Sequence, residues 1–235
     1  MLAKGADGLS LRGLALKLEK NMTIGIIGAG ALGSSVARAL AKVGFKATIA
    51  NSRGPETLAD LVKDIGPLIT AGTLAEAASA DIVLVALRWE DAGRVLKALP
   101  AWNGRIVIDA TNPVAFLAED SPERNDPTNP LANYGIKAID LEGAPSTEII
   151  AGFLPGARVV KAFNHLGGYL LAEPVVNGGQ RVLFYSGDDA VAKAEVRDLL
   201  EKMGFFPVDL GMQAVGAPLA QLPFGALSAT NFVKV

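Results

Sequence analysis

Runs of four or five aliphatic and β-branched residues recur along the chain, separated by longer segments in which apolar and polar positions mix. The short runs show no polar alternation, which indicates strands buried on both faces of a parallel sheet that helices cover. The pattern predicts strands at Ile24–Ile27, Ala47–Ala50, Leu68–Thr70, Ile82–Ala86, Ile106–Asp109, Arg158–Ala162, Arg181–Tyr185 and Pro207–Leu210. It predicts helices at Ala31–Val43, Pro55–Ile65, Leu74–Ser79 and Glu90–Leu99, then one from about Thr147 that Ser146 can cap, and one that starts within Ser186–Asp189 and stops at Gly204. We therefore expect an α/β protein with a Rossmann-type, doubly wound, mainly parallel sheet and a small C-terminal α/β extension.

This alternation of strands and helices begins only after Met22, and it divides the chain into three parts. Residues 1–21 are expected to be an N-terminal extension, either a short amphipathic helix or an artefact of the assigned start. Residues 22–165 are expected to form the Rossmann domain, and residues 166–235 a small C-terminal region. Between Asp109 and Pro145 we expect a long irregular stretch, of the kind that forms lids, binding loops or mobile segments.

Composition excludes several classes of protein. The 235 residues carry a formal net charge of −2, so the chain lacks the basic excess of a general nucleic-acid binder. With no Cys and one His, neither a disulfide framework nor a metal site is expected. The longest uncharged run, Leu210 to Val233, contains Pro218 and Pro223, which would break a spanning helix. We expect a cytoplasmic protein without a nucleic-acid or membrane partner.

A glycine-rich turn joins the first predicted strand to the first predicted helix. Gly28 permits a tight turn, Gly30 lets the backbone approach a pyrophosphate, and Gly33 lets helix and strand pack closely. The following helix presents its free N–H groups and positive dipole end to the phosphates. The turn predicts dinucleotide binding by Gly28, Ala29, Gly30, Ala31, Leu32 and Gly33.

The residues after the second predicted strand indicate which dinucleotide binds. NAD sites carry an Asp or Glu there, about 20 residues after the glycines, to bind the ribose hydroxyls. This chain has Asn51, Ser52 and Arg53 instead, so an Arg and a hydroxyl are available for a 2′-phosphate. We therefore predict that NADP(H) binds, with a solvated turn as the alternative.

Three later strand ends are predicted to meet at the same crevice, because ligands of open α/β sheets gather at the carboxyl ends of the strands. Asn164 and the single histidine, His165, are the catalytic candidates, with His165 as a general acid or substrate contact. The alternative for His165 is a structural hydrogen bond, and that for Asn112-Pro113 is a plain turn. Lys161 is expected to point into solvent or toward a helix. The candidates for the nicotinamide end are Leu87, Arg88, Ala110, Thr111, Asn112 and Pro113.

Taken together, these segments resemble the coenzyme F420-dependent NADP oxidoreductase family. The resemblance is carried by the glycine turn, by Asn51–Pro55, Asp109–Pro113 and Lys161–Asn164, and by the segments that begin at Gly187 and Gly204. It implies a homodimer that moves a hydride between NADPH and a deazaflavin, and it extends to the cytosolic reductase domains of membrane metalloreductases, which reduce flavin. It also implies an acceptor pocket and dimer contacts in residues 166–235. Coenzyme F420 or FMN is thus the expected acceptor.

Hydride transfer between two aligned rings needs closeness of about 3–3.5 Å and no covalent nucleophile, which agrees with the absence of any nucleophile–base motif. An imine- or ketone-reducing dehydrogenase would need a long helical second domain, for which the chain after Arg158 is too short. The alternative outside the enzymes is a regulatory protein that senses NADP(H) without turnover. The uncharged run at the C-terminus either crosses to a second subunit, lines an apolar pocket, or covers the edge of its own sheet.

Overall fold

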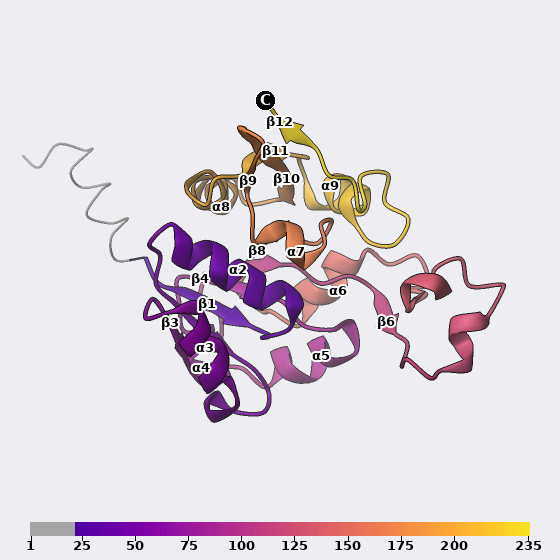
Figure 1. Cartoon of the computed structure of the whole chain (residues 1–235), viewed down its shortest axis with the longest axis horizontal. Helices are drawn as coiled ribbons and strands as arrows, with labels where there is room; N and C mark the ends of the chain where they lie inside the picture. Colours follow the sequence, from indigo (N-terminus) through magenta and orange to yellow (C-terminus); the bar gives the residue numbers. More distant parts are fainter. Residues whose placement is uncertain (1–21) are drawn as a thin grey trace, which may run out of the picture.

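The computed structural model describes residues 22–235, and the expected extension, residues 1–21, lies outside the described residues. One sheet organises the described chain (Figure 1), and its strands lie in the order β11-β10-β8-β5-β4-β1-β2-β3. All neighbours from β8 to β3 are parallel, β10 is antiparallel to β8, and β11 is parallel to β10. The prediction of a Rossmann-type, mainly parallel sheet is confirmed. The strands are β1 (Ile24–Ile27), β2 (Ala47–Ala50), β3 (Ile69–Ala71), β4 (Ile82–Val85), β5 (Ile106–Asp109), β8 (Arg158–Ala162), β10 (Gly179–Gly187) and β11 (Phe206–Asp209).

Helices cover both faces of this sheet because successive side chains of a strand point to opposite faces. Ile26 packs into a core cluster with residues of α2 and α8, whereas Ile27 packs into a second cluster with residues of α4, α5 and α6. Both isoleucines are fully buried, as expected for strands covered on both sides. The helices are α2 (Ala31–Lys42), α3 (Ala59–Ile65), α4 (Leu74–Ala78), α5 (Trp89–Lys97), α6 (Ser146–Gly152), α7 (Gly168–Leu171), α8 (Ala190–Lys202) and α9 (Gln213–Ala220).

Two predicted helix starts are wrong in detail. The segment Pro55–Ile65 is not one helix, because it begins as the 3-10 turn η1 (Pro55–Leu58), in which the Thr57 hydroxyl donates to the carbonyl of Gly54, and only then continues as α3. Ser146 does not cap α6. It is the first residue of that helix, and its hydroxyl donates to Gln221 Oε1 from the far end of the chain. Local sequence could not anticipate this partner.

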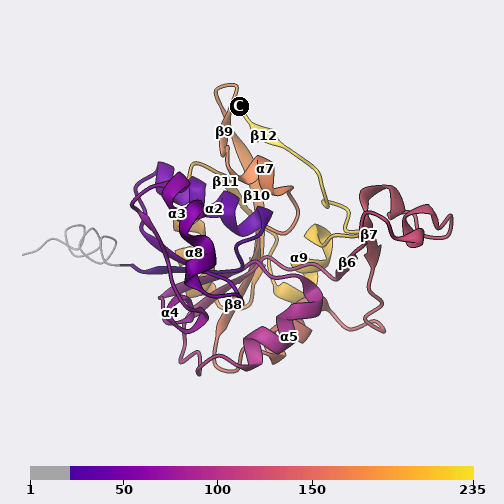
Figure 2. The same cartoon turned by 60° about the horizontal axis from the view of Figure 1, so that its bottom comes forward.

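The stretch between Asp109 and Pro145 is more ordered than predicted. It contains the antiparallel pair β6 (Val114–Phe116) and β7 (Ile136–Ala138) and the 3-10 turns η2 (Pro122–Asn125) and η3 (Ala132–Tyr134). Together they form an arm that projects from the body of the molecule in both views (Figures 1 and 2). Strands of three residues separated by about twenty carry too little periodicity to be recognised from the sequence. We refer to residues 114–138 as the arm.

The C-terminal residues continue the same sheet rather than start a new one. β10 and β11 extend it beyond β8, and the short strands β9 (Val175–Val176) and β12 (Val233–Lys234) pair with β10. The uncharged run folds back on its own chain as α9 and a segment that returns to β12 (Figure 2). Within residues 22–235, no helix has both the length and the apolar character needed to cross a membrane.

Candidate functional site

The glycine turn follows β1, and each of its three positions is glycine for a different structural reason. Gly28 has a φ of +110°, and a Cβ there would collide with the carbonyl of Ala86 on the neighbouring strand end. A Cβ on Gly33 would collide with the carbonyl of Gly28, so this glycine allows α2 to lie close to β1. Gly30 differs, because its φ is −77° and a Cβ there would meet open space. No contact with the described residues requires glycine at position 30, which fits a position that a ligand must approach.

The first turn of α2 is open to an anion. No side chain caps the helix at Gly30, and its first turn contains no acidic residue. The predicted phosphate-binding residues Ala29, Ala31 and Leu32 surround this helix end, and Ala31 is exposed. The amides of a helix start and its positive dipole end favour a phosphate group at this place.

The loop after β2 presents a free cation. The side chain of Asn51 shapes the loop, because its Nδ2 donates to Thr57 Oγ1 at 2.9 Å and its Oδ1 accepts from the Arg53 amide at 2.8 Å. Ser52 and Arg53 are exposed, and the Arg53 guanidinium forms no ion pair with any described residue. Glu56 directly follows the segment Asn51–Pro55, and its carboxylate lies against Gly54. The loop can therefore bind a phosphate through Ser52 and Arg53.

The residues after β4 reach the arm. Leu87 is half-buried and packs against the second core cluster, whereas Arg88 is exposed at the start of α5. The Arg88 guanidinium lies 5.0 Å from the centre of the Phe116 ring on the arm and 3.9 Å from the carboxylate of Glu90. Cation–π geometry of this kind ties the end of β4 to the base of the arm.

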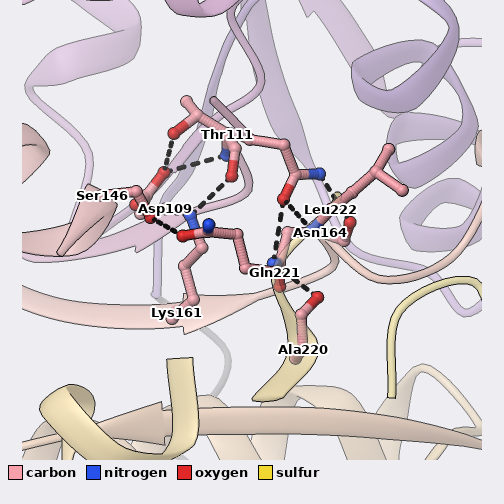
Figure 3. Close-up of polar contacts among 9 residues, drawn as sticks. Asp109, Thr111, Ser146, Lys161, Asn164, Ala220, Gln221 and Leu222 are labelled. Carbon is pink, nitrogen blue, oxygen red and sulfur yellow. Dashed lines mark hydrogen bonds and ion pairs between the residues drawn. The ribbon is translucent and has the colours of Figure 1, made fainter. Parts of the chain in front are cut away.

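Beneath the turn after β5 lies a buried ion pair that contradicts the expectation for Lys161. Its ammonium contacts Asp109 Oδ2 at 2.9 Å and donates to the Thr111 carbonyl, and both charged side chains are at most 1% exposed (Figure 3). Asp109 Oδ1 accepts from the Thr111 amide at 2.9 Å and from its hydroxyl at 2.7 Å. Lys161 therefore points under the turn and not into solvent. The pair holds the backbone of Ala110 and Thr111 in place.

Sequence reasoning missed this pair, although a signal exists. Asp109 and Lys161 face each other in the parallel register of β5 and β8. Opposite charges within two otherwise apolar strands are rarely tolerated without a partner, since unpaired buried charges are costly. The strand order would have been needed to place them side by side.

Asn112 and Asn164 connect the strand ends to the C-terminal segment. Asn112 Nδ2 donates to the backbone carbonyl of Asn164 at 2.7 Å, and Asn112 Oδ1 accepts from the backbone amide of Leu222 at 2.9 Å. Asn164 Nδ2 donates to Asn112 Oδ1 at 3.2 Å and to the Ala220 carbonyl at 3.0 Å. Phe163, which precedes Asn164, is buried and has a φ of +65°. Both side chains therefore hold the C-terminal segment against the sheet (Figure 3).

His165 lies in the interior beside these asparagines. It is 2% exposed, its ring centre lies 4.9 Å from that of Phe184, and neither ring nitrogen has a hydrogen-bond partner among the described residues. Burial lowers the pKa of His165 to about 4, and the backbone of Val182 opposes that shift without forming a well-aligned bond. A general acid works best with a pKa near the working pH. The geometry therefore favours packing over proton transfer, and a catalytic role for His165 stays a prediction.

The buried imidazole predicts a pH-dependent stability. The unfolded chain binds a proton near pH 6.5 and the folded chain only near pH 4, so the free energy of unfolding should fall as the pH decreases through this window, by about 3 kcal/mol in total. Urea unfolding between pH 4 and 7.5 measures it. His165→Phe, which keeps a ring against Phe184, should lose this part of the slope. Equal slopes for both proteins would show that His165 contributes nothing.

A cavity of about 540 Å³ opens next to the turn after β5. Pro113 forms one wall, residues 138–146 a second, and residues of α9 and the segment after it a third. The walls are mostly apolar, with the Ser146 hydroxyl bonded to Gln221 within them. The cavity thus joins the predicted nicotinamide end to the C-terminal region. The structure brings Gly28–Gly33, Leu87, Ala110–Pro113 and Asn164 to the carboxyl ends of four adjacent strands, with Ser52 and Arg53 after β2 at the same edge.

Comparisons with known proteins connect this architecture to a family. Residues 23–113 match the family model described as NADP oxidoreductase, coenzyme F420-dependent. The crystal structure of a hypothetical protein from Sinorhizobium meliloti is 37% identical, with a TM-score of 0.80 over 94% of this chain and 100% of that chain. A protein from Arthrobacter sp. FB24, provisionally named an F420-dependent NADP reductase, is 27% identical with a TM-score of 0.61, over 84% of this chain and 89% of that chain.

One relative is a larger protein. The metalloreductase STEAP3 of Rattus norvegicus is 28% identical over 87% of this chain, but the match covers 37% of that protein. The chain therefore spans little more than a third of the length of the curated relative it matches.

Proposed function

We propose, for a chain that belongs to the coenzyme F420-dependent NADP oxidoreductase family, that it transfers a hydride between NADP(H) and a deazaflavin or flavin acceptor. The prediction of the family, and with it of an NADP oxidoreductase, is confirmed. What we propose beyond this is the identity of the acceptor and the residues that bind NADP(H) and the acceptor. Its main support is that the open helix start at Gly30 and the turn that leads to Pro113 on the cavity wall lie at the carboxyl ends of strands of the same parallel sheet.

The residues at this edge of the sheet fit an NADP molecule. The uncapped start of α2 and the open space at Gly30 would hold the pyrophosphate, as the glycine turn of this fold does. Ser52 and Arg53 would hold the 2′-phosphate, and the turn of Ala110–Pro113 would support the nicotinamide end. When bound, NADPH supplies the hydride, and the acceptor takes up that hydride together with one proton from solvent.

The chain itself contributes alignment rather than acid–base chemistry. Asp109 and Lys161 hold the turn on which the nicotinamide end would lie, and Asn112 and Asn164 hold the C-terminal wall of the cavity. Holding two reactants in contact replaces an encounter in solution and lowers the barrier. We therefore propose Asn164 as a positioning residue and assign no proton transfer to it.

Residues 22–165 are proposed to bind NADP(H), and residues 166–235 to complete the acceptor cavity through Pro218, Gln221, Pro223 and Phe224. We also propose a homodimer, supported by exposed apolar side chains near the C-terminus, among them Met212, Val215 and Val235. Light scattering of the purified chain tests this; a mass of one chain at all concentrations would exclude it.

Arg53→Ala should weaken NADPH binding by about 1–3 kcal/mol, the range for a lost charge-assisted hydrogen bond, and leave NADH nearly unchanged. The reason is that the guanidinium has no other partner among the described residues and would contact only the 2′-phosphate. Calorimetric titration with each nucleotide measures the effect. Lys63→Ala, which removes an exposed cation from α3, is the matched control. Equal losses for both nucleotides would remove the 2′-phosphate role.

The central test is NADPH oxidation followed by absorbance with deazaflavin, flavin and quinone acceptors. Turnover with a deazaflavin or flavin is expected. Binding of NADPH without oxidation by any acceptor would instead support the alternative of an NADP(H) sensor.

A further inference from the structure

The charge on the cavity wall is unusual for a site that takes an anionic coenzyme. Among the described residues that line it there is no Lys, Arg or His, and Asp140 is the single ionisable one. Asp140 is exposed, and its Oδ1 accepts from the backbone amide of Glu142 at 2.9 Å, which holds the carboxylate on the cavity wall. The exposed Glu142 adds a second carboxylate beside the cavity.

Three cations of the surrounding elements already have partners. Lys161 is neutralised by Asp109 beneath the turn, and Lys137, on the strand that leads into the cavity wall, lies 3.5 Å from Glu123. Arg88 lies over the Phe116 ring and near Glu90. None of these three cations lines the cavity. An anionic group that enters would therefore meet a carboxylate and, among the lining residues of the described chain, no compensating positive charge.

Apart from Asp140, the polar side chains that line the cavity are neutral and suit a ring with carbonyl oxygens. The Ser146 hydroxyl donates to Gln221 Oε1, which orients the amide of Gln221. The Gln221 amide nitrogen then has no bond to any described residue and can donate to a ring carbonyl. Pro113, Pro223 and Phe224 supply apolar surface for the faces of the ring.

We infer that the cavity selects an uncharged ring acceptor and discriminates against acceptors that carry a phosphate or carboxylate tail. This inference rests on the proposed function, since it names the class of acceptor for the same site. The class comprises flavin and deazaflavin ring systems without an anionic tail. Overall, NADPH, one proton and the oxidised ring give NADP⁺ and the two-electron-reduced ring.

The test uses four acceptors that vary ring and tail independently. Riboflavin and FMN share one ring, and the deazaflavin chromophore without its tail shares its ring with coenzyme F420. The dissociation constant of each is measured by fluorescence quenching in the presence of NADP⁺, and turnover is measured separately with NADPH. Within each pair, the uncharged acceptor should bind at least about tenfold more tightly, the size of effect that one or two like charges produce at a partly exposed site.

Asp140→Lys should reverse much of this preference by tightening FMN and coenzyme F420 while leaving their uncharged counterparts nearly unchanged. Asp120→Lys makes the same charge change on an exposed part of the arm that does not line the cavity, and it should leave the preference unaltered. Equal or tighter binding of the anionic acceptors, no binding of any acceptor, or identical effects of the two substitutions would overturn the inference. Selective binding without turnover would instead overturn the proposed function and leave the charge selection standing.

Discussion

Gly30→Val should abolish the binding of both NADPH and NADH while the protein stays folded. The two valine methyl groups would occupy the open space in front of the first turn of α2, where the backbone must approach the pyrophosphate. The fold tolerates the change because φ at this position is −77° and a Cβ meets no atom within 4 Å. Calorimetric titration measures binding, and circular dichroism with thermal unfolding measures the fold.

Gly33→Val is the matched control, because a Cβ there collides with the carbonyl of Gly28. That variant should be strongly destabilised, so the two substitutions in one turn separate a ligand requirement from a packing requirement. Undiminished affinity in the folded Gly30→Val protein would refute the placement of the pyrophosphate. A Gly30→Val protein that fails to fold would show that a side chain at position 30 collides with the rest of the protein.

Lys161→Met should lower the free energy of unfolding by about 3–5 kcal/mol, because removing one partner leaves the other charge buried without compensation. The carboxylate of Asp109 would remain 0% exposed, and the Thr111 carbonyl would lose a donor. Urea unfolding monitored by fluorescence measures the change. A loss below about 1 kcal/mol, the typical range of exposed pairs, would show that water reaches the carboxylate.

The double variant Asp109→Asn/Lys161→Met tests the interaction itself. Asn at position 109 can still accept from the Thr111 amide and hydroxyl, so the turn keeps its local bonds while both charges are gone. We expect the double variant to recover a substantial part of the stability lost in Lys161→Met, since neutral replacements of a buried ion pair are often tolerated. If the stability loss of the double variant equalled the sum of the losses in Asp109→Asn and Lys161→Met, the two residues would act independently.

Much of the fold follows from local pattern. The strands β1, β2, β5 and β8 have the predicted bounds, because uninterrupted β-branched runs in a doubly covered sheet carry a strong signal. The arm did not follow, since its three-residue strands depend on a pairing between Val114 and Ala138 that is distant in sequence. The start of α6 was misassigned because the Ser146 hydroxyl bonds to a residue 75 positions away instead of capping its own helix.

The candidate site likewise has parts that follow from local sequence and parts that depend on contacts between distant residues. The glycine turn and the Ser52–Arg53 loop are contiguous segments whose geometry depends on a few neighbouring dihedral angles and one strand–helix contact. The sequence alone therefore determined them as phosphate-binding candidates, together with the family to which the chain belongs. Asn112 and Asn164 were recognised as important, but their partners, Ala220 and Leu222, come from the C-terminal segment.

Only the tertiary structure decided which side chains meet. Within residues 22–235, the fold determined that Lys161 neutralises Asp109, that the His165 ring is enclosed without a hydrogen-bond partner, and that Asp140 is the single charge on the cavity wall. The physical reason is that burial and electrostatic pairing depend on the order of strands in space. Periodicity along the chain reports which face of an element is covered, and it contains no information about which distant residue covers it.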